Sequence, residues 1–418
     1  MSSVQLLQNV TLDDLATGAD TTSATNEPTV ARFLDHVLMT GNTFASHSVD
    51  GGASWTHLDP FTEFPHAAGG FCCDQIVIHH RGRNLWFRVL QYDTGPGGAP
   101  NIVRLAVSTN GTPAPGSWTT YDFAPQDFDS AWQTGTQLDR PDIATSSRHL
   151  FMTMNVFREN WLATVVMRIP LADLEAHAAL NLEYYTLDAN FGQRSSVCLT
   201  HGATTDMYMM GAEVGNPVRI FRWPDAPGSA MSQFDISTTL PWTGSLRQGD
   251  YISICPNGAT NWLRKQHSRP AGWVTGNRVG FMWNALPNAT RPQPWIKTLI
   301  ADTTTMTVVA EPDLWSDIAW AYPAPCPNVN GVVGVSLFVG GVTLNPRHAV
   351  GFLDNNQWVL VATADSNEAP RGFPWGDYVS CATNDPDGTQ WVASGYSLQG
   401  GFGGRFVEPQ YVRFAIGP

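Results

Sequence analysis

The sequence predicts an all-β protein: one β-propeller domain over residues 1–418, with seven four-stranded blades. Three observations lead to this prediction. The composition suits short strands joined by tight turns, a pattern of Asp followed by an apolar run recurs along the chain, and one short motif is typical of a blade hairpin.

The composition favours strands over helices. The chain has 418 residues with 38 Gly, 29 Pro and 16 Trp, and 43% of its residues are hydrophobic, which is enough for a large core. Only 14% are charged, against roughly 25% in ordinary globular proteins. The length alone suggests two or three domains, but all-β folds often extend this far as one unit.

A loose repeat supplies the blade count. Each copy is a loop that ends in Asp, an apolar run, a short turn, and a second run with an aromatic residue; the four aspartates are Asp74, Asp142, Asp250 and Asp377. The intervals after Asp142 and after Asp250 are long enough for one further unit each. Ser196–Glu213 and Asn328–Gly340 fill these places, and an opening unit at Pro28–Pro60 makes seven. Units of this length with about four strands are typical of propeller blades.

The chain ends predict how the ring closes. Val4–Val10 belongs to no unit, so we expect it to be the outer strand of the last blade, beside Tyr411–Ile416, where it would cover two sheet edges. The best helical signal is Leu171–Leu180, which follows Pro170. An array of two-sheet sandwiches is the alternative fold, but it explains the recurrent Asp less well.

Charge and hydropathy exclude two classes of partner. A net charge of −13 argues against nucleic acid, which needs a basic surface. No run approaches the roughly 18 apolar residues of a membrane span. The first residues lack the charged and apolar regions of a signal peptide, and secretion or a periplasmic location stays open if such a segment was removed.

The six cysteines are too few for a disulfide scaffold in a chain of this size. Cys72 and Cys73 are adjacent and can form a vicinal disulfide, which the sequence leaves open. Cys198, Cys255 and Cys381 lie in apolar runs, where buried thiols are expected. No cysteine or histidine cluster has the spacing of a zinc site.

The segment Ser48–Trp55 fits the pattern S-x-D-x-G-x-[ST]-W of a tight hairpin turn. Asp50 can accept hydrogen bonds from backbone N–H groups of the turn, Gly52 supplies a permissive backbone, and Trp55 can pack between strands. The motif resembles the Asp-box of the sialidase-like propellers, and residues 108–118 hold a degraded copy. The resemblance implies that the box joins the third and fourth strands of a blade, opposite the active-site face. Ser48, Asp50, Gly52 and Trp55 are therefore expected to be structural.

The resemblance does not extend to the chemistry of true sialidases. Those enzymes carry an arginine in a Phe/Tyr-Arg-Ile-Pro motif near the start of the propeller. Here the nearest string is Met167–Pro170, in the middle of the chain. No sialidase arginine or nucleophile is therefore assigned to any residue of this sequence.

The propeller geometry predicts which residues gather on one face. Loops that enter the innermost strands and loops that leave the second strands meet around the central channel, and function concentrates on such loops. Two carboxyl groups, one with a raised pKa, can cleave a glycosidic bond, and crowded carboxylates raise one another's pKa. The candidates for catalysis are Glu213, Asp250, Asp377, Tyr251 and His267.

Substrate binding is predicted for arginines that grip acidic groups, aromatic rings that stack on sugars, and further aspartates. These candidates are Arg140, Asp142, Arg247, Arg371, Trp375, Tyr378 and Asp74. Structural roles are the alternative: an Asp before an inner strand can bond the neighbouring blade, and Trp375 can pack between blades. No cofactor is expected; Ca²⁺ on the channel aspartates is an alternative, although no loop has EF-hand spacing.

The leading functional hypothesis is a glycoside hydrolase or polysaccharide lyase that acts on an oligo- or polysaccharide at this face. In a lyase, Tyr251 or Tyr378 would act with His267 to abstract a proton beside a uronate carboxylate. The second hypothesis is a non-catalytic propeller that binds glycan or protein. The predicted loops differ from blade to blade, which favours one site and hence an enzyme.

Overall fold

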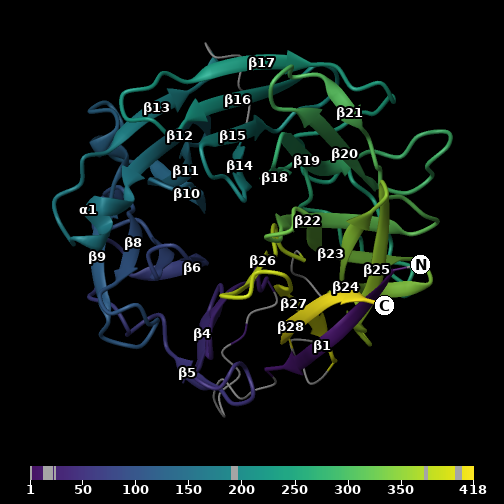
Figure 1. Ribbon diagram of the computed structural model, residues 1–418, viewed down its shortest axis with the longest axis horizontal. Helices are drawn as coiled ribbons and strands as arrows, with labels where there is room; N and C mark the ends of the chain where they lie inside the picture. The colour runs from purple at the N-terminus through teal and green to yellow at the C-terminus, as the bar shows by residue number, and fades with distance from the viewer. Residues whose placement is uncertain (1, 13–21, 23–24, 190–195, 371–374, 401–406) are drawn as a thin grey trace.

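The computed structural model of the protein describes residues 2–12, 22, 25–189, 196–370, 375–400 and 407–418. Its strands form a ring, and the chain ends lie close together on the rim (Figure 1). The described strands fall into seven antiparallel groups of four, which follow one another around the ring. This arrangement is a β-propeller, as the sequence predicts.

The first four groups lie between Thr29 and Ile236. Group one contains β2 (Thr29–Phe33), β3 (His36–Gly41), β4 (Phe44–Ser48) and β5 (Thr56–Leu58). Group two contains β6 (Phe71–His80), β7 (Leu85–Tyr92), β8 (Val103–Ser108) and β9 (Trp118–Phe123). Group three contains β10 (Gln137–Thr145), β11 (His149–Arg158), β12 (Asn160–Pro170) and β13 (Glu183–Leu187). Group four contains β14 (Val197–His201), β15 (Asp206–Gly211), β16 (Val218–Pro224) and β17 (Ser232–Ile236).

The remaining groups complete the ring. Group five contains β18 (Pro270–Thr275), β19 (Arg278–Ala285), β20 (Trp295–Asp302) and β21 (Val308–Ala310). Group six contains β22 (Ala319–Pro327), β23 (Val333–Gly341), β24 (Leu344–Asp354) and β25 (Gln357–Ala364). Group seven contains β26 (Cys381–Asp385), β27 (Trp391–Leu398), β28 (Val407–Gly417) and β1 (Ser3–Thr11). The described helical elements are η1 (Pro96–Gly98), η2 (Pro125–Asp127) and α1 (Leu171–Glu175).

The N-terminal strand closes the ring, as predicted. β1 pairs antiparallel with β28, with Val4 opposite Ile416 and Val10 opposite Tyr411. Each of these strands thereby covers an edge that the other would leave open. Neighbouring innermost strands also meet in parallel, β2 with β26 and β14 with β18.

The core lies between neighbouring groups. Middle strands are buried on both faces, so β7 and β27 are buried at every position. Trp391 of β27, for example, stacks on Phe352 of β24 and on Phe414 of β28. Gly334 is required beside it, because a Cβ there would lie 2.4 Å from Trp391 Nε1.

Two predicted inner strands are wrong in position. The unit placed at Asp250 begins with β18 at Pro270, and residues 250–262 form a loop. Asn261 builds this loop by accepting from the Ser253 backbone and donating to the Tyr251 carbonyl. The unit placed at Asn328 begins with β22, and Asn328 instead caps the turn after that strand. The predicted helix is also shorter than expected, ending at Glu175.

The segment Ser48–Trp55 forms the expected turn between β4 and β5, the third and fourth strands of their group. Asp50 Oδ1 accepts from the backbone of Ala53 at 3.0 Å and of Ser54 at 2.8 Å. The Trp55 ring packs edge-on against Tyr411, with the centroids 5.4 Å apart.

Arg168, the arginine of the sialidase-like string, has a structural position in β12. It is fully buried, pairs with Glu183 at 2.8 Å, and lies over the Trp223 ring. Among the described residues, no helix has the length and apolar character needed to cross a membrane.

Candidate functional site

The inner strands of all seven groups line a central cavity of about 690 Å³. One end of this cavity lies where the chain enters the inner strands, and we call this end the channel mouth. The cavity wall near the mouth includes Asp142, Arg269, Tyr322, Asp377 and Tyr378. Glu27, Asp74, Asp139, Arg140 and His267 lie at the starts of inner strands or in the loops just before them, and interact with this set or with one another.

Three residues of the mouth share an unusual backbone geometry. Glu27, Arg140 and Tyr322 have φ angles of 47°, 51° and 57°. Each stands directly before a proline, and a residue before proline normally adopts an extended conformation. Positive φ is uncommon for non-glycine residues and persists only where the surrounding structure imposes it. The same local geometry thus sets the direction of three side chains at the channel mouth.

Bulges accompany this geometry in β10 and β22. Pairing between β10 and β11 shifts between Asp139 and Asp142, and pairing between β22 and β23 shifts between Ala321 and Ala324. The extra residues include Arg140 in the first case and Tyr322 in the second. Bulges re-aim side chains and are frequent beside functional sites.

Two carboxyl groups of the mouth hold protons more tightly than usual. Glu27 is 5% exposed, and its burial and the nearby Asp74 and Asp377 hold its pKa well above its ordinary range. Burial and then the charge of Asp139 raise the pKa of Asp74 to about 7. Asn42 Nδ2 donates to Glu27 Oε2 at 2.9 Å and fixes this carboxyl group. Asp74 is therefore suited to donate a proton near neutral pH, and Glu27 holds its proton more tightly than an ordinary glutamate.

Arg140 supplies the positive charge at the centre of the cluster. It forms an ion pair with Asp377 and donates to His267 Nε2 at 2.9 Å. Because arginine can only donate, His267 accepts at Nε2 and is neutral there. Burial, reinforced by Arg140, lowers the pKa of His267 to about 4.

Several polar groups near the mouth lack a partner within the described part of the chain. The Tyr322 and Tyr378 hydroxyls and Arg269 Nη1 are buried without a hydrogen bond. Tyr322 is 4% exposed, and the Arg269 guanidinium lies 5.5 Å from the Tyr378 ring centroid. Buried polar groups are normally satisfied, so these three are available to a ligand or to water.

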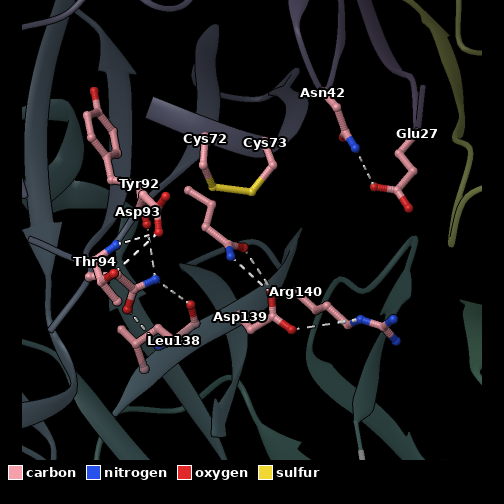
Figure 2. Close-up of a disulfide and its surroundings, with 12 residues drawn as sticks. Glu27, Asn42, Cys72, Cys73, Tyr92, Asp93, Thr94, Leu138, Asp139 and Arg140 are labelled. Atoms are coloured by element: carbon pink, nitrogen blue, oxygen red, sulfur yellow. Dashed lines mark hydrogen bonds and ion pairs between the residues drawn. A yellow bond between two sulfur atoms is a disulfide. The ribbon is translucent and has the colours of Figure 1, made fainter. Parts of the chain in front are cut away.

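The adjacent Cys72 and Cys73 form a disulfide at the start of β6, directly before Asp74. Figure 2 shows this bond together with Asp139, Arg140 and Glu27. Gln91 of β7 donates to Asp139 Oδ1 at 3.0 Å, which ties the second group of strands to the third.

The structure brings five predicted site residues together at the mouth: Asp74, Arg140, His267, Asp377 and Tyr378. Asp142 lines the cavity, and its carboxylate accepts from the Leu199 backbone at 3.2 Å. Asp142 therefore also bonds the neighbouring group of strands, as the structural alternative for such aspartates predicts.

Other predicted residues lie elsewhere. Asp250 is exposed and accepts from Ser245 Oγ at 2.6 Å, and Arg247 is exposed in the same loop. Tyr251 is fully buried, donates to the Asn284 carbonyl at 3.0 Å, and has a pKa raised by burial to about 12. Glu213 follows β15, and its charge acts on Arg219 of β16.

Trp375 is fully buried and stacks on Tyr396, with centroids 4.6 Å apart, so its ring has no free face for a sugar. Arg371 lies outside the described residues.

Sequence reasoning missed Glu27 and Asp139. The signal for Glu27 is its place before Pro28 at the entry to the first inner strand, the same X-Pro arrangement as Arg140-Pro141. Asp139 gave no signal beyond its position next to Arg140. Across the described ranges, no three His, Cys, Asp or Glu side chains group in a way that could hold a metal ion.

The sequence matches no protein-family model and no curated protein. Solved structures give weak likenesses. The GH93 α-L-arabinofuranosidase of Fusarium graminearum is 11% identical, with 98% of each chain covered and a TM-score of 0.47. The α-L-arabinanase of Penicillium chrysogenum is 10% identical, with 97% of this chain and 98% of that chain covered and a TM-score of 0.44. The NanB sialidase of Streptococcus pneumoniae is 8% identical over 80% of this chain and 67% of that chain, with a TM-score of 0.44. At these levels no activity, substrate or residue role passes to this chain.

Proposed function

We propose that the protein is a glycoside hydrolase that cleaves an oligo- or polysaccharide at the channel mouth. The observation that carries this proposal is the carboxyl cluster around Arg140, in which Glu27 and Asp74 have raised pKa values while Asp377 is paired with the guanidinium. Glycoside cleavage needs one protonated and one ionised carboxyl group, and different environments for neighbouring carboxyls provide this difference.

In this mechanism Glu27 or Asp74 donates its proton to the glycosidic oxygen as the bond to the anomeric carbon breaks. Asp377, which pairs with the Arg140 guanidinium, is the second carboxyl group, and it either attacks the anomeric carbon or activates a water molecule. Arg140 holds Asp377 in place through the ion pair. His267 is a positioning residue, because its Nε2 accepts from Arg140.

The unpartnered groups near the mouth suit a sugar ligand. The hydroxyls of Tyr322 and Tyr378 can bond sugar hydroxyls, and Arg269 Nη1 can bond a hydroxyl or an acidic substituent. The cavity volume of about 690 Å³ falls within the range of small-molecule sites, roughly 300–1,000 Å³.

A hydrolase is favoured over a lyase by the state of the candidate bases. A lyase would use a tyrosinate, but burial and nearby carboxylates hold the pKa of Tyr378 well above its ordinary value. The Tyr251 hydroxyl is already engaged, because it accepts from the Ser245 backbone N–H and donates to the Asn284 carbonyl. The accepting nitrogen of His267 is occupied by Arg140.

The test is a turnover screen of the purified protein on neutral and acidic polysaccharides and aryl glycosides, following reducing ends and unsaturated products. We expect reducing ends without unsaturated products. Glu27→Gln, Asp74→Asn and Asp377→Asn should each lower kcat, by about 10²–10⁴-fold for the acid. Asp250→Asn is the matched control, because Asp250 lies on an exposed loop outside the cluster.

Cleavage that survives all three substitutions would refute the site. Cleavage that yields unsaturated products would replace the hydrolase with a lyase. Glycan retention without turnover on any substrate would refute the enzyme and favour a binding module.

A further inference from the structure

The Cys72–Cys73 disulfide lies within a bulge of an innermost strand. β6 pairs with β7 through Phe71 opposite Tyr92 and then Gln75 opposite Leu90. Cys72, Cys73 and Asp74 therefore stand against the single residue Gln91, outside the regular ladder. Such a segment lacks the hydrogen bonds that normally fix a strand.

The bulge of β6 has counterparts at the same level of the ring. β10 and β22 bulge at Arg140 and Tyr322, and in both strands a proline follows the functional residue. Proline fixes its own φ angle and restrains the residue before it. The bulge of β6 contains no proline, and a disulfide links two of its residues instead.

The residue that follows the disulfide is a member of the carboxyl cluster. Asp74 is 9% exposed and interacts with charged groups from the entrances of four other inner strands: Glu27 before β2, Asp139 and Arg140 in β10, Arg269 before β18, and Asp377 before β26. A small displacement of this backbone would change each of these interactions.

The disulfide is also open to chemical reduction. Cys72 and Cys73 are partly exposed, whereas Cys198, Cys255, Cys326 and Cys381 are buried. Burial raises the pKa values of these four thiols, which makes them poor nucleophiles. The other four cysteines are free thiols with no bond to reduce, so a dithiol reagent should act at the 72–73 bond.

We propose that the Cys72–Cys73 disulfide is a positioning element of the site, which fixes the bulge of β6 and thereby holds Asp74 in the carboxyl cluster. The inference rests on the proposed function for its effect on turnover. Its effect on the surroundings of Asp74 is independent of any substrate. Reduction by a dithiol transfers two electrons and two protons, giving two cysteine thiols and a cyclic disulfide of the reagent.

The experiment compares three forms of the full chain: the oxidised protein, the protein reduced with dithiothreitol, and the Cys72→Ser/Cys73→Ser variant. The first readout needs no substrate. It is the difference in unfolding free energy between the native sequence and Asp74→Asn, followed from pH 5 to pH 8. Asp74→Asn is combined with each of the three forms.

In the oxidised form this difference should vary strongly with pH, because the pKa of Asp74 is raised to about 7. In the other two forms it should flatten, since Asp74 is released from the cluster and its pKa falls. An unchanged pH dependence in the reduced form would overturn the proposal, whether or not the protein is an enzyme.

The second readout is turnover of any substrate that the screen identifies. Loss of the bond should lower kcat about tenfold or more with little change in KM, because misplacing a reacting group by about 1 Å is costly. With Asp74 as the proton donor, the rate falls at alkaline pH as Asp74 ionises. This fall should move to lower pH when the disulfide is lost, because the pKa of Asp74 then decreases. The serine variant should not respond to dithiothreitol, which controls for effects at other sites. Equal kcat and an equal pH profile in the oxidised and reduced forms would contradict the proposal.

Discussion

Arg140 and Asp377 form an ion pair across the channel mouth, although they belong to the entrances of the third and seventh groups of strands. The side chains of Arg140 and Asp377 are only 18% and 16% exposed, so salt screens their attraction weakly. The same guanidinium binds His267, before the fifth group. One side chain thus joins three separate parts of the ring, and its loss would leave the partly buried Asp377 without its ion-pair partner.

Arg140→Lys should therefore be strongly destabilising despite keeping the charge. A lysine ammonium lacks the planar fork that serves Asp377 and His267 together. We expect the unfolding free energy to fall by about 1–3 kcal/mol, because one of the two partners of the guanidinium is left without its hydrogen bond. The measurement is urea denaturation. Arg219→Lys, in the more exposed pair with Asp235, is the control and should cost less than about 1 kcal/mol. Equal losses in the two variants would show that the mouth pair is not special.

The raised pKa of Asp74 makes the fold less stable as the pH rises. Its pKa is about 7 in the folded protein against an ordinary value of 3.8. The protonated form is thus favoured by folding, and this stabilisation is full below pH 3.8 and is lost as the pH rises through 7. Asp74→Asn should make the unfolding free energy depend less on pH. At pH 8 the variant should be more stable than the native protein by about 2–4 kcal/mol. Chemical denaturation at pH 5 and pH 8 measures the effect. Asp250→Asn should leave the slope unchanged, and a similar change in both variants would refute the assignment to Asp74.

The ring closure was predictable from the sequence because it depends on local patterns. The apolar run Val4–Val10 needed a partner, and β28 provides it. The turn at Asp50 follows from a side chain that bonds its own neighbours. The prediction of an inner strand after Asp250 was wrong because a contact outside the run decides its structure. The run Tyr251–Ile254 has the apolar character of a strand, but the Asn261 side chain satisfies its backbone groups within a loop.

The site was predictable mainly where the repeat places a residue at an inner strand or in the loop that enters it. Asp74 and Arg140 meet this condition, and both lie in the cluster. Glu27 does not, because its approach to Asp74 depends on ring closure and on a positive φ angle that the sequence suggests only through Pro28. The raised pKa values likewise arise from contacts between groups far apart in the chain, which no local pattern encodes.

The turn at Asp50 should contribute to stability and not to the proposed activity. Asp50 accepts from two backbone N–H groups and from the hydroxyls of Ser48 and Ser54. Asp50→Ala should therefore lower the Tm and leave kcat unchanged, since the turn joins β4 to β5 on the face opposite the mouth. Asn110→Ala, in the degraded copy, is the matched control; Asn110 accepts from one backbone N–H and should cost less. A loss of activity in the folded Asp50 variant would contradict this separation of faces.

His348 should limit stability on the acid side. It is fully buried in β24, with hydroxyl partners at 2.7 Å on both ring nitrogens, Ser336 on Nε2 and Thr363 on Nδ1. Burial lowers its pKa to about 3 from an ordinary value of 6.5. Folding thus favours the neutral ring, and its stabilisation is present above pH 6.5 and is lost as the pH falls toward 3. Between pH 6.5 and pH 4 the loss should amount to about 2–3 kcal/mol.

His348→Gln tests this assignment through the slope of stability against pH, because a glutamine does not titrate. The variant should lose part of the decline below pH 6.5, whatever its stability at pH 7. His267→Gln should act in the same direction, since the pKa of His267 is lowered to about 4. Both effects oppose that of Asp74, whose stabilisation grows as the pH falls. Urea denaturation of His348→Gln, His267→Gln and Asp74→Asn from pH 4 to pH 8 separates the three contributions. If the stability of His348→Gln falls below pH 6.5 as steeply as that of the native protein, the role of His348 is refuted.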